Sequence, residues 1–352
     1  MLFDFDLLLR LLGIWLFSTL LTLLTGFLSL KVTHKLGILD VPGSAPHKQH
    51  ETSTPIGGGL ALILSLAIAV TLLGMWRQPQ IQSLILPVIV VFIFGLWDDA
   101  RGLSASQKLI GQTIAAGCLI LLGTRVRMFE YSDAFFGGSG PLFLALDYLV
   151  TFVWLVGITN AYNLVDSMDG IVVGLSGWAS GFFIFILIAT GQTELALFCT
   201  VLLGCIIGLT FYNVYPARMF LGDSGAQTIG FILAAIAILY TPVGAFQESS
   251  WFVPILIFGV PIFDTGLVIF SRLRRKQLVS TSHLDHTYHR LIKLGLSRNH
   301  AVIAMHISAQ ITLAIGFIAL YQEPLIANII FFSVIFVGFG LICLLDQLKY
   351  WP

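Results

Sequence analysis

The stretch "IVVFIFGLWDDARG", residues 89–102, joins nine almost purely apolar residues to two adjacent carboxylates, Asp98 and Asp99. The whole chain shares this apolar character, since 57% of its 352 residues are hydrophobic and only 10% are charged, with a mean hydropathy of +0.94. A soluble globular domain carries about 25% charged residues. Long uncharged stretches recur from one end of the chain to the other, which is typical of a polytopic helical membrane protein. The sequence therefore predicts an all-α integral-membrane protein.

Eleven apolar stretches are candidate membrane spans. Because no soluble second domain separates them, residues 1–352 are predicted to form a single integral-membrane domain. A transmembrane barrel would instead show alternating segments of about ten residues. The predicted spans cover residues 7–30, 57–76, 81–97, 106–123, 142–160, 170–190, 194–213, 225–241, 251–271, 301–320 and 325–345.

The distribution of positive charge predicts the orientation of these spans, because lysine and arginine concentrate in cytoplasmic loops. Of the 18 lysines and arginines, all but Arg10, Arg77, Arg125 and Arg127 fall on the side of the membrane that holds the C-terminus. An odd number of spans places the two termini on opposite sides. The N-terminus is therefore predicted to lie outside and the C-terminus in the cytoplasm, with the protein in the plasma (inner) membrane.

Most carboxylates near the spans fall on the same cytoplasmic side as the lysines and arginines. Charged groups at the membrane edge are costly and usually mark a functional site. A face that holds both cations and carboxylates predicts a site for an anionic ligand together with a metal ion. The carboxylates are Asp98, Asp99, Asp166, Asp169 and Asp223 at span ends, and Asp264 inside the ninth span.

Asp98 and Asp99 end the third span, which is predicted to run from outside to inside. The dipole of that helix disfavours anions at its C-terminus by ~0.3–1 kcal/mol, so a solvated interfacial pair, which is the alternative, carries a penalty. Adjacent helical residues point about 100° apart, and the two carboxylates are therefore not expected to be equivalent. Lys108, nine residues after Asp99, is placed to pair with them or to bind a phosphate.

The segment "TNAYNLVDSMDGI", residues 159–171, repeats a polar side chain at every third position, as Asn160, Asn163, Asp166 and Asp169. Consecutive members are neighbours on a helix, but the ladder is about 13.5 Å long at ~1.5 Å per residue. One metal ion could contact only one or two of these side chains, so the others are expected to bind a larger ligand. The alternative is a polar helix end closed by a glycine.

Asp223 lies in "MFLGDSGAQ", residues 219–227, just before the eighth span. An aspartate is a preferred helix N-cap, and a purely structural cap is therefore the alternative here. Magnesium takes carboxylate oxygens from the protein, with phosphates completing its coordination. An aspartate at the edge of the site suits that role.

The segment "HKQHETSTPIGGG", residues 47–59, supplies Lys48 and His50 ahead of three glycines that open the second span. Glycine-rich helix N-termini bind phosphate through their backbone N–H groups. The alternative is an ordinary positively charged cytoplasmic loop.

A second histidine-containing segment, "HLDHTYHRLIKLG" at residues 283–295, supplies His286, His289 and Arg290. A zinc site would need further ligands, and no cysteine or glutamate lies nearby to complete a usual set. Contact with a diphosphate is the preferred interpretation.

Six motifs in this order resemble those of the polyprenyl-phosphate N-acetylhexosamine-1-phosphate transferases: "KQHETSTPIGGG", "GLWDDARGLSASQKLIGQ", "NAYNLVDSMDG", "FYNVYPARMFLGDSG", "VPIFDT" and "HTYHRL". The resemblance covers about residues 37–296. It implies a catalytic domain that transfers a sugar 1-phosphate from a UDP-sugar to a polyprenyl (undecaprenyl) phosphate and releases UMP. The expected group is GlcNAc-1-phosphate, for the first step of a cell-surface glycan, and phospho-MurNAc-pentapeptide is the alternative. The implied cofactor is Mg²⁺, with Mn²⁺ as a substitute.

Carried over by motif, the resemblance also implies a role for each site residue. Asp98 and Asp99 would be the catalytic carboxylates near the lipid phosphate, and Lys108 would bind that phosphate. Asn163 and Asp223 would hold the metal. The other substrate-binding positions would be Lys48, His50, Asp166, Asp169, His286, His289 and Arg290.

Two positions depart from the family pattern and leave the sugar preference open. Tyr288 stands where related enzymes often have histidine, and Ser167 stands where glycine is common. The implied partners are a UDP-sugar, a polyprenyl phosphate and the membrane, with no nucleic acid, while a homodimer is left open. A transporter of an anionic solute is the alternative of another class, but transporter sites lie near the membrane midplane, whereas the polar residues here lie at one face.

Overall fold

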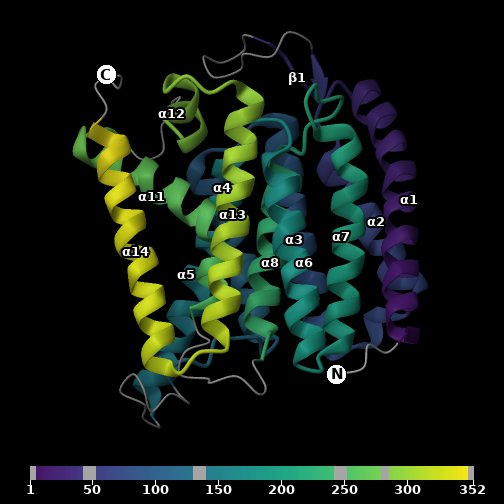
Figure 1. The fold of residues 1–352 in the computed structure, drawn as a ribbon. Coiled ribbons are helices and arrows are strands. Elements are labelled where there is room, and N and C mark those ends of the chain that lie inside the picture. Colours follow the sequence, from purple (N-terminus) through teal and green to yellow (C-terminus); the bar gives the residue numbers. More distant parts are fainter. Residues whose placement is uncertain (1–4, 43–52, 130–139, 242–251, 279–284, 348–352) are drawn as a thin grey trace.

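The computed structural model describes residues 5–42, 53–129, 140–241, 252–278 and 285–347. In these ranges the chain is almost entirely helical, and the helices form one bundle (Figure 1). Two strands, β1 (Leu39–Asp40) and β2 (Thr54–Pro55), pair antiparallel, and η1 (Met75–Arg77) is a short 3-10 helix. The α-helices are α1 (Phe5–Leu36), α2 (Gly58–Leu72), α3 (Pro79–Arg101), α4 (Ala105–Leu121), α5 (Pro141–Val165), α6 (Ile171–Ala189), α7 (Thr193–Asn213), α8 (Gly222–Leu239), α10 (Val253–Ile257), α11 (Gly259–Arg274), α12 (Thr287–Lys293), α13 (Arg298–Leu320) and α14 (Pro324–Gln347).

The predicted all-α membrane class is confirmed, and each predicted span contains helix. Within the described ranges, eight helices are long and apolar enough to cross a membrane, namely α1, α3, α5, α6, α7, α8, α13 and α14. The ninth predicted span, residues 251–271, is not one continuous helix but is divided between α10 and α11. Pro261 has no N–H to donate to the carbonyl of Ile257, so the helix is interrupted at Phe258. The number of membrane crossings stays a prediction.

The side chains of α1 are distributed as expected for a helix in lipid. Its large apolar residues, such as Leu16, Leu20 and Leu24, are more than half exposed, which a helix in water would avoid. In a bilayer, helices associate instead through small residues that let their backbones approach closely. The buried residues of α1 are accordingly small or hydroxyl-bearing: Ser18, Thr19, Thr22, Thr25, Gly26, Ser29 and Thr33.

The face of α7 that packs on α1 carries two glycines four residues apart, Gly204 and Gly208. A Cβ at Gly204 would lie 2.6 Å from the carbonyl oxygen of Trp15, and one at Gly208 would lie 2.6 Å from the Cβ of Thr22. Only glycine permits so close an approach of the two helices.

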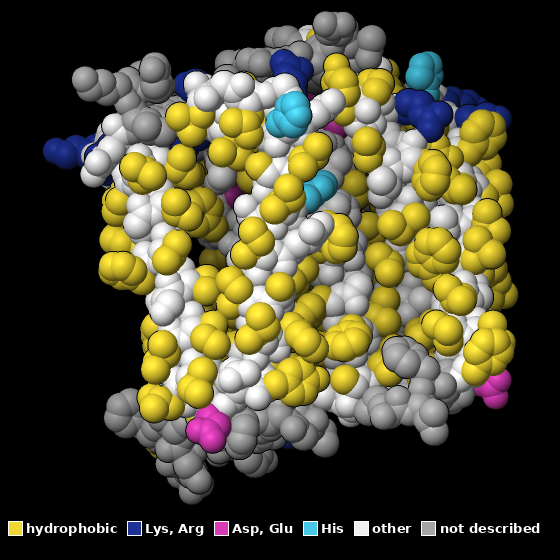
Figure 2. Space-filling model, in the orientation of Figure 1, with side chains coloured by type: hydrophobic (Ala, Val, Ile, Leu, Met, Phe, Trp, Pro, Cys, Tyr) yellow, Lys and Arg dark blue, Asp and Glu magenta, His cyan; other side chains and the backbone are white. Residues whose placement is uncertain are grey.

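The two ends of the bundle differ in charge. Helix α1 begins and helix α14 ends at opposite ends of the bundle (Figure 1), as an odd number of crossings requires. Lysine and arginine side chains gather at the end that carries β1 and α12, while hydrophobic side chains cover the flank (Figure 2). We call this the basic end. Its assignment to the cytoplasm remains a prediction from the positive-inside rule.

Three helix ends meet at the basic end: the start of α2, the end of α3 and the start of α8. The backbone N–H of Gly58 in α2 donates to the carbonyl of Phe220 (3.0 Å), just before α8. Gly95 of α3 packs on the first turn of α8, where a Cβ would lie 2.5 Å from the Cα of Ser224. These close backbone contacts bring the carboxylates at the end of α3 onto the start of α8.

Candidate active site

Asp99, at the end of α3, caps the first turn of α8. Its Oδ1 accepts a hydrogen bond from the backbone N–H of Asp223 (2.7 Å), and its Oδ2 accepts from the N–H (3.1 Å) and the hydroxyl (2.5 Å) of Ser224. The first N–H groups of a helix lack intrahelical partners and form the positive end of its dipole. The penalty of placing an anion at the C-terminus of α3 is therefore offset by the N-terminus of α8.

Gly222 lets α3 and α8 meet in this way. Its φ of +70° lies in the left-handed region that favours glycine. A Cβ there would lie 2.7 Å from both carboxylate oxygens of Asp99 and 2.3 Å from the Cγ2 of Ile56. A larger residue would push Asp99 away from the N–H groups of α8, so Gly222 is part of what builds the site.

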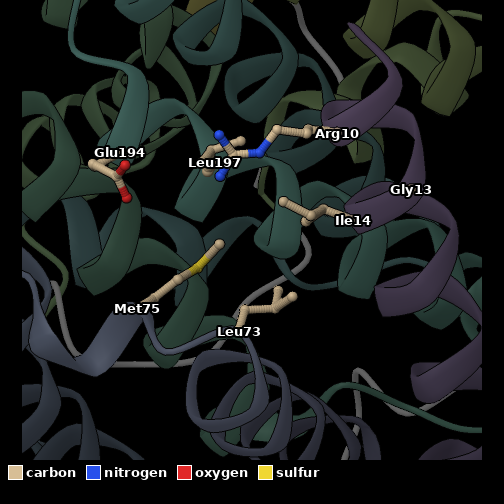
Figure 3. Close-up of a pocket in the computed structure, with 7 residues that line it drawn as sticks. All are labelled: Arg10, Gly13, Ile14, Leu73, Met75, Glu194 and Leu197. Atoms are coloured by element: carbon tan, nitrogen blue, oxygen red, sulfur yellow. The ribbon is translucent and has the colours of Figure 1, made fainter. Parts of the chain in front are cut away.

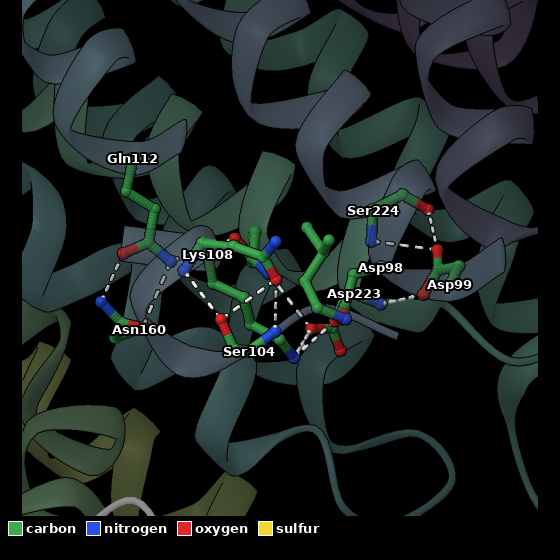
Figure 4. A network of polar contacts seen from close by, with 11 residues as sticks. Asp98, Asp99, Ser104, Lys108, Gln112, Asn160, Asp223 and Ser224 are labelled. Carbon is green, nitrogen blue, oxygen red and sulfur yellow. Dashed lines mark hydrogen bonds and ion pairs between the residues drawn. The ribbon is translucent and has the colours of Figure 1, made fainter. Parts of the chain in front are cut away.

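Asp98 faces different partners from Asp99 (Figure 4). Its Oδ1 accepts from the backbone N–H of Leu103 (2.5 Å), and its Oδ2 forms an ion pair with Lys108. The Nζ of Lys108 also donates to Oδ2 of Asp223 (2.5 Å), so one ammonium group bridges two carboxylates from α3 and α8. The side chain of Asp98 is 9% exposed, against 28% for Lys108 and 26% for Asp223. Lys108 and Asp223 therefore form the accessible edge of the cluster.

The polar residues that recur at every third position from Asn160 to Asp169 have different partners in the structure. Asn160 pairs with Gln112 of α4 inside the bundle, with its Nδ2 donating to the Gln112 Oε1 (2.6 Å) and its Oδ1 accepting from the Gln112 Nε2 (3.2 Å). Asn163 lies close enough to Asp223 to interact with its carboxylate. Asn163, and not Asn160, is therefore the amide of this series that lies beside the metal ligand expected on α8.

Asp166 and Asp169 lie in the connection between α5 and α6. Oδ2 of Asp169 accepts from the backbone N–H of Ala217 (2.9 Å) and so holds the connection between α7 and α8. Burial and the nearby charges of Asp223, Asp99 and Asp169 raise the pKa of Asp166 well above its usual range. A group of carboxylates that disfavours its own ionisation has a high affinity for a cation.

A second cluster forms where α11 meets α12. Nδ1 of His286 lies 2.8 Å from Oδ2 of Asp264, and Oδ1 of Asp264 accepts from the backbone N–H of Thr287 (2.6 Å). Asp264 is fully buried. Its carboxylate therefore orients the His286 ring and favours a proton on Nδ1, which leaves Nε2 as the ring atom that can face a ligand.

Tyr288 joins this second cluster to the connection between α5 and α6. Its hydroxyl donates to the carbonyl of Ser167 (3.1 Å) and lies 2.7 Å from Nε2 of His289. Burial and the charge of His286 lower the pKa of His289 to about 3, so this imidazole is neutral at physiological pH. Since the hydroxyl of Tyr288 gives its hydrogen to Ser167, the single N–H of the neutral His289 is the Nε2–H that donates to this hydroxyl, and Nδ1 is left as an acceptor. The predicted contact of His289 with a diphosphate stays a prediction.

Arg290 does not reach the accessible face, contrary to the diphosphate contact expected from the sequence. Its side chain is fully buried and donates to the carbonyls of Asp285 (3.0 Å) and Leu345 (3.0 Å) and to the hydroxyl of Ser271 (2.7 Å). It also pairs with Asp346 at 3.4 Å. The guanidinium group thus ties α12 to α11 and α14.

Sequence reasoning missed three polar side chains that adjoin the site: Ser224, Gln112 and Gln227. Gln112 follows Lys108 by four residues, and Gln227 follows Asp223 by four. Residues four apart share a face of a helix, and that spacing is the signal that could have found both glutamines. Ser224 directly follows Asp223, and its role depends on the approach of α3.

The carboxylates at the basic end fit a magnesium ion whose coordination is completed by substrate. In the described part of the chain, no three His, Cys, Asp or Glu side chains converge to form a ready-made metal site. Magnesium is usually held by one or two protein carboxylates, with phosphates and water in its other positions. Asp223, with the Asn163 amide beside it, supplies such a partial set at the accessible edge.

Two recesses in the bundle lie apart from these clusters. One, of about 280 Å³, lies at the end opposite the basic end, where α1 and α7 begin. Figure 3 shows the residues that line it. It is lined by Arg10, Gly13, Ile14, Leu73, Met75, Glu194 and Leu197. The other, of about 450 Å³ at the basic end, is lined by Leu30, Lys31, His34, Lys35 and Pro55. The predicted substrate contacts Lys48 and His50 lie outside the described residues.

Known proteins resemble this chain over the region that holds the site. A sequence model of glycosyl transferase family 4 matches residues 81–241. The chain is 30% identical to the "Probable undecaprenyl-phosphate N-acetylglucosaminyl 1-phosphate transferase" of Bacillus subtilis, over 79% of this chain and 76% of the relative. It is 35% identical to the phospho-N-acetylmuramoyl-pentapeptide-transferase of Lactiplantibacillus plantarum, over 68% and 78%. It is 26% identical to the undecaprenyl-phosphate alpha-N-acetylglucosaminyl 1-phosphate transferase of Escherichia coli, over 89% and 84%.

Proposed function

Since this chain belongs to glycosyl transferase family 4, we propose that it transfers a sugar 1-phosphate from a UDP-sugar to a polyprenyl (undecaprenyl) phosphate and releases UMP. The observation that carries the proposal is the cluster at the basic end in which Lys108 bridges Asp98 and Asp223. This cluster combines a cation for a phosphate with carboxylates for a metal. It lies at the edge of a membrane bundle, where a lipid phosphate and a soluble nucleotide can meet.

In the proposed reaction, an oxygen of the polyprenyl phosphate attacks the β-phosphorus of the UDP-sugar. A new P–O bond forms, the bond between the β-phosphorus and the oxygen that bridges to the α-phosphate breaks, and that oxygen leaves as part of UMP. The second pKa of a phosphate monoester is about 6. The attacking phosphate is therefore largely ionised at neutral pH, and a carboxylate base is not obligatory.

Direct attack is favoured over a phospho-aspartate intermediate. Both oxygens of Asp99 accept hydrogen bonds from the start of α8, and both oxygens of Asp98 are engaged by Leu103 and Lys108. A carboxylate nucleophile would have to give up these partners before it attacked. Phosphoryl transfer depends mainly on positioning and charge neutralisation, which the cluster can supply without a covalent step.

In this proposal the phosphates are bound by one cationic side chain and by a metal ion held by two others, which are Lys108, Asp223 and Asn163. The ammonium group of Lys108 would exchange a carboxylate for a phosphate oxygen. Asp223 and Asn163 would hold Mg²⁺, which, when bound, would neutralise charge on the diphosphate and improve UMP as a leaving group. Asp98 would keep Lys108 directed at the accessible edge.

The remainder of the donor site is assigned to Lys48, His50, Asp166, Asp169, His286 and His289. The hydrogen bond from Tyr288 to the carbonyl of Ser167 supports this grouping, because it holds α12 against the connection that carries the two aspartates. His289 is assigned from its motif, because its single N–H faces the Tyr288 hydroxyl. Lys48 and His50 are assigned from their motif alone.

GlcNAc-1-phosphate is the favoured transferred group. The similarity to the GlcNAc-1-phosphate transferases of B. subtilis and E. coli extends over 79% and 89% of this chain. The similarity to the L. plantarum phospho-N-acetylmuramoyl-pentapeptide-transferase extends over 68%, but its higher identity of 35% makes that group the second candidate.

The test is UMP release by the purified protein in detergent with undecaprenyl phosphate, Mg²⁺ and one UDP-sugar at a time. UDP-GlcNAc is expected to give lipid-dependent UMP, and Asp223→Asn is expected to abolish it while leaving the protein folded. Release from UDP-MurNAc-pentapeptide alone would move the assignment to the second candidate. No UMP from any donor would overturn the proposed function.

A further inference from the structure

A layer of three amides, two of them buried, lies one helical turn from the cluster at the basic end. Gln112, Asn160 and Gln227 come from α4, α5 and α8, which also carry residues of the proposed site. Gln112 follows Lys108 by four residues and Gln227 follows Asp223 by four. Each pair therefore shares a helix face, with its members about 6 Å apart along the axis.

The amides form a continuous series of hydrogen bonds that ends on Asp223. Figure 4 shows its first step, the pairing of Asn160 with Gln112. Nδ2 of Asn160 donates to Oε1 of Gln112 (2.6 Å), and Nε2 of Gln112 donates to Oε1 of Gln227 (3.0 Å). Nε2 of Gln227 donates to Oδ2 of Asp223 (3.2 Å). Gln112 and Gln227 are each only 2% exposed, so solvent does not compete for these bonds.

The hydrogen bond between Asn160 and Val156 fixes the orientation of all three amide groups. Nδ2 of Asn160 also donates to the carbonyl oxygen of Val156 (2.9 Å), and a carbonyl can only accept. The nitrogen of Asn160 must therefore face Val156, which turns the nitrogen of Gln112 toward Gln227 and the nitrogen of Gln227 toward Asp223. Reversing any one amide would set two nitrogens or two oxygens against each other.

We propose that Gln227, Gln112 and Asn160 are positioning residues for the transfer reaction, a proposal that rests on the function proposed above. Together they present an N–H group to the inner side of the Asp223 carboxylate and keep its outer side toward the substrate. Lys108 and Gln227 share Oδ2 of Asp223. When Lys108 turns to a phosphate, Gln227 is the donor that still holds the carboxylate in place.

Packing alone does not account for these side chains. A buried amide is costly in a membrane helix unless its hydrogen bonds are made, and an apolar side chain of similar size would fill the same space. The three amides point in consistent directions, and the last N–H group donates to the carboxylate of Asp223 at the accessible edge. The series is therefore explained by a role in holding that carboxylate in position.

The experiment compares Gln227→Met and Gln112→Met, which nearly conserve volume, with Thr228→Val as the matched control. Thr228 is a fully buried residue of α8 whose hydroxyl has no hydrogen-bond partner among the described residues. The measurements are kcat and KM for UDP-GlcNAc, the Tm, and Mn²⁺ binding followed by electron paramagnetic resonance in the presence of UMP.

Gln227→Met is expected to lower kcat by about tenfold or more, because a hydrogen bond to a charged group is lost, and to weaken Mn²⁺ binding. KM should change by less than about twofold, as expected when positioning and not ground-state binding is lost. Gln112→Met should act in the same direction, and the double variant should be no worse than Gln227→Met, because members of one chain are not additive. Thr228→Val should match the wild type.

Wild-type kcat and Mn²⁺ binding in both methionine variants would overturn the positioning role. So would a loss of folded protein with an unchanged kcat for the fraction that remains folded. If Gln227→Met does not fold, Gln112→Met decides the question by itself, since its side chain does not touch Asp223. If the wild type releases no UMP from any donor, the proposed function fails, and the Mn²⁺ binding of the variants still tests the positioning of Asp223.

Discussion

At the scale of single residues, Asp98 and Asp99 are adjacent in the chain but belong to different contacts. Asp99 accepts hydrogen bonds from the start of α8, and Asp98 pairs with Lys108 on α4. The turn of about 100° between neighbours on a helix directs the two carboxylates at different helices. The two carboxylates are adjacent in the sequence, but in the fold Asp99 contacts α8 and Asp98 contacts α4.

Asparagine substitutions should separate these two contacts. Asp98→Asn removes the charge that directs Lys108 and is expected to lower kcat by orders of magnitude with little change in Tm. Asp99→Asn sets an amide N–H against the donors of Asp223 and Ser224, and should also cost about 1–2 kcal/mol of stability, as the loss of a helix cap does. The measurements are kcat, KM for both substrates and Tm. Equal losses of Tm, or wild-type turnover in both variants, would contradict this division.

The raised pKa of Asp166 predicts an effect of pH on stability. A carboxyl whose pKa is higher in the folded state than in the unfolded state stabilises the fold below its unfolded pKa, about 4, and that stability is lost as pH rises through the folded pKa. Asp166→Asn keeps the uncharged form at every pH. Its Tm should exceed that of the wild type at neutral pH, with a gap that closes toward pH ~4, while transfer activity falls. A lower Tm than the wild type at neutral pH would refute this.

At the scale of helices, neighbouring residues of α12 contact different parts of the fold. His289 lies beside Tyr288 at the connection between α5 and α6, whereas Arg290, the next residue, is buried against α11 and α14. The sequence motif treats the two as a single group of ligands. Helical geometry directs His289 toward the connection between α5 and α6 and Arg290 toward α11 and α14.

Two glycines with different surroundings should respond in opposite ways to alanine substitution. Gly208→Ala would place a Cβ 2.6 Å from that of Thr22 and is expected to destabilise the protein by about 1–3 kcal/mol through overpacking. Gly157, in the exposed face of α5, has open space around it. Gly157→Ala should be neutral or stabilising, because glycine inside a helix costs about 1 kcal/mol relative to alanine. The check is the Tm of both variants in detergent, and a stable Gly208→Ala would show that the helices can separate without penalty.

At the scale of the whole molecule, positive charge is concentrated at one end of the bundle and apolar side chains cover its flank (Figure 2). The helix ends that build the site all lie at this basic end. A site that joins a lipid phosphate to a charged soluble donor needs such a position, because neither substrate can leave its own medium.

Cysteine labelling in intact cells tests the orientation of the bundle. Asn299 and Glu323 are exposed residues near the two ends of α13. Glu323→Cys should react with a membrane-impermeant thiol reagent, and Asn299→Cys should react only after permeabilisation, because the basic end is predicted to be cytoplasmic. The parent chain with its own cysteines is the control. The reverse pattern would place the site outside the cell, away from a cytosolic nucleotide.

Composition and the spacing of apolar residues were sufficient to predict the fold class and helix in every predicted span. In lipid, a long apolar segment must satisfy its backbone hydrogen bonds internally, so hydropathy alone predicts a helix. The interruption at Phe258 had its signal in Pro261, which cannot complete a helical hydrogen bond. The motifs around Asp98, Lys108, Asn163 and Asp223 likewise identified candidates before their positions were known.

The tertiary structure alone decided which of these candidates meet. The spacing of four residues places Gln112 on the face of Lys108 and Gln227 on the face of Asp223, but the sequence contains no indication that the two glutamines meet. Nor does it indicate that Asp99 caps α8 or that Arg290 is buried. The physical reason is that periodicity fixes directions within a helix, whereas hydropathy does not say which helices are neighbours. The close fit of glycines and the pairing of buried polar groups choose the neighbours, and both depend on the three-dimensional arrangement of segments that lie far apart in the chain.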